Sequence, residues 1–222
     1  STFGYIAYEE ETELVVWLKD TWRRSEPDLD IDTEGEIYRI LHKADVRNIP
    51  KLVCAGDVFS TANVTESSSP QTTTTQAYVE ETWACDSETT GIGHHTHYRH
   101  VVLGIGRPLT SFKSPEEVVA AVADAQIAHE DAFGTRILHR DISAGNILIS
   151  LDGKGGLLID WELALNLDRT VRTTRQWITG TWQFMSFRLL KQIGKGHQVS
   201  DDMESILWVL IFVFLRYYPG SL

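Results

Sequence analysis

The chain has 222 residues, of which 42% are hydrophobic, and its formal net charge at pH 7 is −11. This length is sufficient for one large domain or two small ones with a real core. The acidic balance excludes nucleic acid as an expected partner, because no Lys/Arg run is longer than pairs such as Arg23-Arg24. Two cysteines without CxxC spacing, Cys54 and Cys85, favour a reducing intracellular compartment, either cytoplasm or nucleus.

The first sixty residues alternate between strand and helix patterns. Two apolar stretches on either side of the turn at 9–12 predict a β-hairpin. The stretch TEGEIYRILHKA at 33–44 carries apolar residues at helical spacing and predicts a short amphipathic helix. The stretch KLVCAGDVF at 51–59 predicts the next strand.

The middle of the chain begins with a Ser/Thr-rich insertion from Ser60 to Gln76, which has almost no large apolar side chains and predicts a mobile loop. Two strands are predicted after it, at Tyr78–Cys85 and Tyr98–Ile105. Four histidines fall between positions 94 and 100. Without a spaced acidic or cysteine partner, these histidines are interpreted as a surface loop rather than as a metal site.

The second half reads as mainly helical. Ser114 and Glu117 have the spacing of a capping box, and Pro115 suits the first position of a helix that ends at Gly134. Short apolar runs at 147–149 and 157–159 predict a small hairpin. The apolar run at 205–215 is too short for a membrane span, which needs about 20 residues. The run therefore predicts a buried helix, and no membrane role is expected.

Three oxygen-bearing side chains adjoin the predicted hairpin. Asp141 and Asn146 precede its first strand, and Asp160 follows its second strand. The hairpin would place the three side chains on one edge. There, one carboxylate and the amide suit Mg²⁺, and the other carboxylate can accept the proton of a substrate hydroxyl. A single Asp is more often a cap or a turn residue, but three in this order favour catalysis.

The sequence HRD-x₄-N from His139 to Asn146, followed by Asp160, resembles the catalytic loop and metal-binding motif of protein kinases. The resemblance implies a catalytic set of Asp141, Arg140 and His139. It implies that Asn146 and Asp160 bind Mg²⁺. It also implies an ATP-binding set of four residues, namely Lys19, Glu36, Asn146 and Asp160.

In this resemblance Lys19 contacts the nucleotide phosphates, and Glu36 in the following helix is its ion-pair partner. Glu34 is the competing choice for that partner, because the helical register is open.

The segments HRDISAGNILI, LIDWELA, GTWQFMS and DDMESILWVL together resemble the fungal-type protein kinases. The resemblance implies an α+β, two-lobed protein-kinase-like fold. Residues 1–105 would form the N-lobe, a small antiparallel β-sheet with one helix and the insertion at 60–76. Residues 106–222 would form a mainly helical C-lobe, in which Asp202 opens the central helix and anchors the catalytic loop.

Four features depart from the usual kinase pattern. Ser143 replaces a phosphate-binding lysine, as is expected in the fungal branch, and Glu162 replaces the glycine of the metal motif. Arg188 reverses the charge of the usual glutamate at the end of the activation segment. Gly4 is the only glycine among the first thirty residues. We therefore expect no Gly-rich phosphate loop, with the first strand and the last C-lobe helices missing.

The resemblance implies an ATP-dependent kinase that phosphorylates Ser/Thr hydroxyls of proteins. Two alternatives stay open, a small-molecule phosphotransferase similar to aminoglycoside or choline kinases, and an inactive pseudokinase scaffold. The sequence does not decide the oligomeric state, the substrate or the need for activating phosphorylation. The candidate phosphorylation sites are Thr170, Thr173, Thr174, Thr179 and Thr181.

Overall fold

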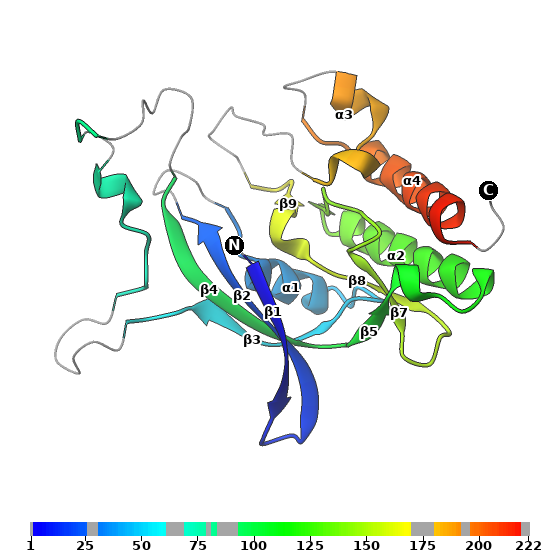
Figure 1. The fold of residues 1–222 in the computed structure, drawn as a ribbon, viewed down its shortest axis with the longest axis horizontal. Helices are drawn as coiled ribbons and strands as arrows, with labels where there is room; N and C mark the ends of the chain where they lie inside the picture. Colours follow the sequence, from blue (N-terminus) through cyan, green and yellow to red (C-terminus); the bar gives the residue numbers. More distant parts are fainter. Residues whose placement is uncertain are drawn as a thin grey trace.

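The computed structural model describes residues 2–25, 31–60, 69–78, 81–83, 93–169, 180–191 and 196–218. They form an antiparallel sheet with one helix against it, followed by a mainly helical region with small β-hairpins (Figure 1). This is the predicted α+β, kinase-like fold. Among the described residues, none of the helices is both long and apolar enough to cross a lipid bilayer.

The main sheet has four strands in the order β1-β2-β4-β3, with every neighbouring pair antiparallel. Their bounds are Thr2–Glu9 for β1, Leu14–Arg24 for β2, Lys51–Asp57 for β3 and His95–Leu103 for β4. The predicted hairpin is confirmed as β1 and β2, which extends beyond the rest of the sheet in Figure 1. The central position of β2 brings Lys19 into the middle of the sheet.

Helix α1 (Glu34–Lys43) packs against the sheet and buries Ile37, Tyr38 and Leu41 on one face. Its N-terminus is fixed by a capping box, in which the Thr33 hydroxyl accepts from the Glu36 amide and the Glu36 carboxylate accepts from the Thr33 amide. Such a box satisfies two backbone donors of the first turn. The predicted amphipathic helix is therefore confirmed, and its start is set by local hydrogen bonds.

The second region is built on two long helices, α2 (Pro115–Gly134) and α4 (Val199–Tyr217), which lie side by side (Figure 1). The remaining elements are short. They are β5 (Gly106–Pro108), β6 (Ile137–Leu138), β7 (Ile147–Ser150), β8 (Gly156–Leu158), β9 (Leu165–Asn166), α3 (Phe187–Lys191), and 3₁₀ helices at Thr75–Tyr78, Leu109–Ser111, Trp161–Leu163 and Trp182–Phe184. Strands β5, β7 and β8 form one small sheet, while β6 pairs with β9.

The start of α2 differs from the prediction. Pro115 is its first residue, but the Ser114 side chain makes no capping hydrogen bond. The Glu117 carboxylate instead accepts from the Lys113 amide and from Arg107 Nη2, at 2.7 and 2.8 Å. The predicted capping box is therefore wrong, because a charged partner outside the helix binds the glutamate.

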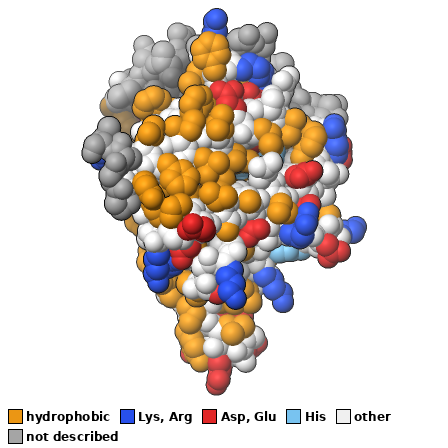
Figure 2. Space-filling view, turned by 90° about the vertical axis from the view of Figure 1, so that its right-hand side faces the viewer, with side chains coloured by type: hydrophobic (Ala, Val, Ile, Leu, Met, Phe, Trp, Pro, Cys, Tyr) orange, Lys and Arg blue, Asp and Glu red, His pale blue; other side chains and the backbone are white. Residues whose placement is uncertain are grey.

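Helix α4 is buried on one side only, by residues such as Ile206, Val209 and Val213. The prediction of a buried helix is thus half correct. Hydrophobic side chains gather on the face of the molecule shown in Figure 2. The exposed large apolar residues of α4 are Met203, Leu207, Trp208, Ile211, Leu215 and Tyr217.

The Ser/Thr-rich insertion is not wholly a loop in its described part. Gln71 donates its backbone N–H to Val58 O, and the Gln71 carbonyl accepts from the His97 amide, both at 2.8 Å. Thr72 forms a β-bridge with Thr96. Residues 69–73 thus lie alongside β4, because backbone pairing does not require apolar side chains. Residues 61–68 lie outside the described part of the chain.

One strand prediction and one loop prediction need correction. No strand forms in the described part of Tyr78–Cys85, which contains the end of the 3₁₀ helix Thr75–Tyr78 and a turn at 81–83. Residues 79–80 and 84–92 lie outside the described residues. The histidine tract is not a surface loop, because β4 begins at His95. Its histidines pack instead: His97 stacks on Trp22 with ring centroids 4.8 Å apart, and His100 is buried.

Candidate active site

The predicted catalytic loop runs from His139 to Asn146 between β6 and β7. Its start is held by Asp202, in the first turn of α4, whose carboxylate accepts the backbone N–H groups of His139 and Arg140 at 3.1 Å. Arg140 has a positive φ of 70°, which is unfavourable for a residue with a side chain. The two hydrogen bonds hold this strained backbone, so the expected anchoring role of Asp202 is confirmed.

Asp202 itself is fully buried between two histidines. His129 Nε2 and His197 Nε2 each lie 2.8 Å from its carboxylate oxygens. Burial alone would raise the pKa of Asp202, but hydrogen bonds to these histidines outweigh burial and hold the pKa well below its usual range. Sequence reasoning missed both histidines, because only the fold brings α2 and the segment before α4 to the loop.

Asp141, the predicted base, is oriented from two sides. Asn146 Nδ2 donates to the Asp141 backbone oxygen at 2.8 Å and to its Oδ2 at 3.2 Å. Thr181 donates from its backbone N and its hydroxyl to Asp141 Oδ1, at 2.7 and 2.8 Å. The sequence indicates Thr181 only as a candidate phosphorylation site and gives no signal for its contact with Asp141.

The small hairpin β7–β8 brings Asp160 to the catalytic loop. Ile147 pairs with Leu158, and the Ile159 amide donates to the Asn146 carbonyl at 2.9 Å. Asn146 before the first strand and Asp160 after the second therefore lie at the same edge of the hairpin, as the sequence predicted.

His139 joins this edge to the catalytic loop from within the core. Its Nε2 lies 3.0 Å from the Ile159 carbonyl, and its Nδ1 lies 3.2 Å from the Asp141 amide. These partners fix a neutral ring with the proton on Nε2. Burial lowers the pKa of His139, which keeps the ring neutral. His139 is fully buried and packs edge-on against Trp161, so it is a positioning residue rather than one that meets substrate.

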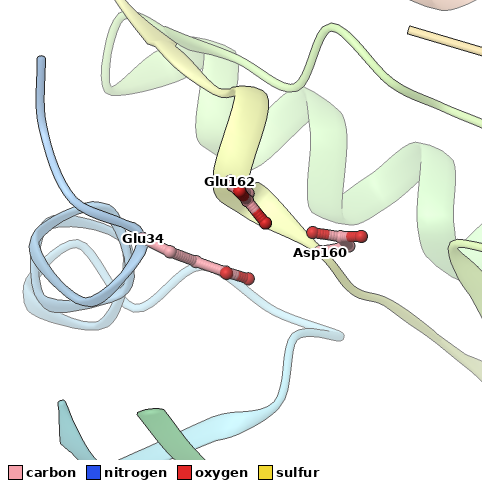
Figure 3. A group of neighbouring side chains, drawn as sticks. All are labelled: Glu34, Asp160 and Glu162. Atoms are coloured by element: carbon pink, nitrogen blue, oxygen red, sulfur yellow. The ribbon is translucent and has the colours of Figure 1, made fainter. Parts of the chain in front are cut away.

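Lys19 is the centre of the charged part of the site. Its Nζ lies 2.9 Å from Glu34, 2.7 Å from Asp160 and 2.8 Å from Glu162. Figure 3 shows the three carboxylates converging from α1 and from the segment that follows β8. A strand, a helix and the metal motif, far apart in sequence, thus meet at one ammonium group.

The partner of Lys19 in α1 is Glu34, so the predicted ion pair between Lys19 and Glu36 is wrong. Glu36 is used in the capping box with Thr33 and lies on the exposed side of the first turn. Glu34, by contrast, has a side chain only 3% exposed, and it also accepts the Trp161 backbone N–H at 3.1 Å. The capping geometry decides the register, because it directs the residue after the cap inward.

Burial and charge shift the pKa values of this cluster in different directions. Burial would lower the pKa of Lys19, but the three neighbouring carboxylates outweigh it and raise the pKa above its usual value. Burial raises the pKa of Glu34 to about 7 in spite of Lys19. Asp160 is also partly buried, yet the Lys19 charge lowers its pKa. Lys19 and Asp160 are therefore both charged near neutral pH.

The donor set fits a hard divalent cation. Glu34, Asp160 and Glu162 can each offer one oxygen within 4.8 Å of the others, but Lys19 Nζ already lies against all three, so the pair considered for a metal is Asp160 with Asn146. Because Asn146 uses its amide nitrogen on Asp141, a metal would be bound through its amide oxygen. Oxygen ligands of this kind are those that Mg²⁺ prefers.

The end of the expected activation segment is bound to α4 and to the residues just before it. Arg188 donates from Nε to Asp201 Oδ1 at 3.0 Å and from Nη2 to the Gly196 carbonyl at 2.9 Å. The reversed charge at position 188 therefore has an acidic partner in the first turn of α4. Ser143, at the position of the usual lysine, is buried and supplies no positive charge. Thr170, Thr173, Thr174 and Thr179 lie outside the described residues.

A lysine–glutamate pair, a catalytic loop anchored on a central helix, and a metal motif on a hairpin define the protein-kinase class of phosphotransferases. The comparison with family models agrees with this class: the model described as fungal protein kinase matches residues 1–214. The chain belongs to the fungal protein kinase family. A search of curated proteins found no match.

Proposed function

We propose that this kinase transfers the γ-phosphoryl group of ATP to Ser/Thr hydroxyl groups of proteins, with Mg²⁺ as its metal. The observation that supports this most strongly is the meeting of Lys19, Glu34 and Asp160 at 2.7–2.9 Å, with Asp160 on the same hairpin edge as Asn146. Phosphoryl transfer requires positioned positive charge and metal ligands more than covalent chemistry. The chain provides both next to a candidate base.

Each side chain has a distinct part in the proposed reaction. Asp141 accepts the proton of the acceptor hydroxyl as the oxygen of that hydroxyl attacks the γ-phosphorus and ADP leaves. Its Oδ1 accepts two hydrogen bonds from Thr181, whereas Oδ2 accepts one longer bond from Asn146 at 3.2 Å, so Oδ2 is the oxygen that we assign to the acceptor. Lys19 orients the phosphates, and Asn146 with Asp160 would hold Mg²⁺. The bound ion would neutralise phosphate charge.

Two further assignments rest on indirect support. The division into lobes at residues 105 and 106 follows the end of the four-stranded sheet. We propose an intracellular location, in cytoplasm or nucleus, which is supported by the low cysteine content and by the free thiol of Cys54.

The second candidate is a small-molecule phosphotransferase, favoured by the sequence Asp160-Trp161-Glu162. Against it stands the docking of Arg188 on Asp201, which fixes residues beyond the metal motif as the end of a protein-kinase activation segment would be fixed. A protein acceptor remains the better proposal, because small-molecule kinases do not usually carry this segment.

The test is transfer of labelled γ-phosphate from Mg-ATP to a generic protein acceptor and to small hydroxylated acceptors. The Asp141→Asn variant should keep the melting temperature and nucleotide binding but lose about 10²- to 10⁴-fold in rate, which is the usual contribution of a general base. Asp131→Asn, which affects an ion pair with Arg47 on the surface, is the matched control and should keep the rate.

The outcomes separate the candidates. Transfer to small acceptors alone would favour the second candidate, and an Asp141→Asn variant as fast as wild type would refute the assigned base. If the wild type transfers no phosphate and millimolar Mg-ATP leaves its melting temperature unchanged, the chain is a scaffold rather than a kinase that binds nucleotide.

A further inference from the structure

Three carboxylate oxygens surround one ammonium group in the site. An ammonium has three N–H donors, and Lys19 Nζ lies within 2.9 Å of Glu34, Asp160 and Glu162. The Lys19 side chain is only 7% exposed, so water has little access to it. A phosphate oxygen can therefore reach Lys19 only if one carboxylate gives up its place.

The three carboxylates differ in how readily they can leave. Glu34 is 3% exposed and also accepts the Trp161 amide, so its displacement would leave a buried charge and a buried donor without partners. Asp160 is exposed to a similar degree, at 39%, but it accepts a hydrogen bond from Nζ at 2.7 Å and is the residue assigned to the metal, so it stays in place. Glu162 makes an ion pair with Lys19, and its side chain is 34% exposed, so water can solvate it after release.

We propose that Glu162 competes with nucleotide phosphates for Lys19 and thereby sets the nucleotide affinity of the site. This inference rests on the proposed ATP-dependent function. Glu162 is the carboxylate that moves away when a nucleotide binds, while Glu34 and Asp160 stay with Lys19. Its negative charge also repels the phosphates that approach the same ammonium group. Nucleotide binding is therefore weaker than it would be with a neutral side chain at this position.

The backbone around Glu162 supports a role for the side chain alone. Glu162 lies inside the 3₁₀ helix Trp161–Leu163, whose first residue is fully buried. Trp161 Nε1 donates to the Leu158 carbonyl at 3.2 Å, which holds this short helix on the hairpin. Release of Lys19 therefore requires rotation of the Glu162 side chain and no rearrangement of the metal motif.

The experiment compares wild type, Glu162→Gln and the matched control Glu116→Gln by titration calorimetry with ATP and ADP. Both substitutions remove one negative charge, but Glu116 is exposed in the first turn of α2. Each titration is carried out with Mg²⁺ and again with EDTA. Glutamine keeps the shape and leaves a neutral, weaker acceptor for Lys19.

Glu162→Gln should bind ATP and ADP about two- to fivefold more tightly than wild type, in Mg²⁺ and in EDTA, as expected for a partly exposed ion pair. Glu116→Gln should bind as wild type does. Binding by the variant alone would also support the proposal.

Three results would overturn it. Unchanged affinity would show that Glu162 does not compete, while leaving the proposed function intact. Weaker binding of the variant in Mg²⁺ only would make Glu162 a metal ligand instead. Absence of binding by both proteins would remove this inference together with the ATP-dependent function.

Discussion

Asp202→Asn is the substitution that most directly tests how the catalytic loop is held. Asp202 accepts four donors with two oxygens: the backbone N–H groups of His139 and Arg140, and the side chains of His129 and His197. Asparagine keeps one accepting oxygen, and its NH₂ group faces the two N–H donors that the other oxygen of Asp202 had accepted. The variant therefore leaves buried donors without an acceptor, although the side-chain shape is nearly unchanged.

The size of the loss follows from counting these donors. Two buried hydrogen bonds are lost, and each buried donor left unsatisfied costs about 1–3 kcal/mol. We expect Asp202→Asn to lower the free energy of unfolding by about 3–5 kcal/mol, a large part of the 5–15 kcal/mol typical of domains. Phosphotransfer should also fall, because the strained Arg140 backbone loses its restraint.

Urea denaturation followed by tryptophan fluorescence measures this loss, with Asp131→Asn as the control. Asp131 pairs with Arg47, whose side chain is 64% exposed, so its loss should cost less than about 1 kcal/mol. If Asp202→Asn does not fold, His197→Ala should still fold with a loss of about 1.5–3 kcal/mol from one charged hydrogen bond. A loss for Asp202→Asn no larger than that of the control would refute the anchoring role.

The other predictions concern the cluster around Lys19. At pH 8, where Glu34 with its pKa of about 7 is mostly ionised, Glu34→Gln should weaken ATP binding about tenfold because Lys19 loses its buried charged partner. In the same titration Glu36→Gln should change the dissociation constant by less than about twofold. Equal effects would contradict the assignment of Glu34.

Burial, aided by the Lys19 charge, lowers the pKa of His100 from 6.5 to about 4. Between these two pH values the unfolded chain binds a proton at His100 that the folded chain does not bind. As pH falls from about 6.5 to about 4, wild type should lose up to about 3 kcal/mol more stability than His100→Gln, measured by urea denaturation at several pH values. Parallel losses would mean that His100 is not held neutral. Glu34, whose pKa is about 7, titrates in the opposite sense in both proteins.

The order of elements was largely readable from the sequence. Hairpin β1–β2, helices α1, α2 and α4, and hairpin β7–β8 follow from local periodicity and turn residues, which act over a few neighbours. Patterns that depend on distant partners were misread. Glu117 has the spacing of a capping box but binds Arg107, and the polar residues at 69–73 pair with β4 through their backbone.

The sequence was sufficient to predict that Asn146 and Asp160 lie at one edge, because a single short hairpin separates them. Which groups surround Lys19 depends on the packing of segments that are distant in sequence. Glu34 and Glu36 are equally close to it in sequence, and the Thr33 cap, which directs Glu34 inward, distinguishes them. The contacts of Glu162, His129 and His197 likewise depend on packing between distant segments, for which the sequence carries no local signal.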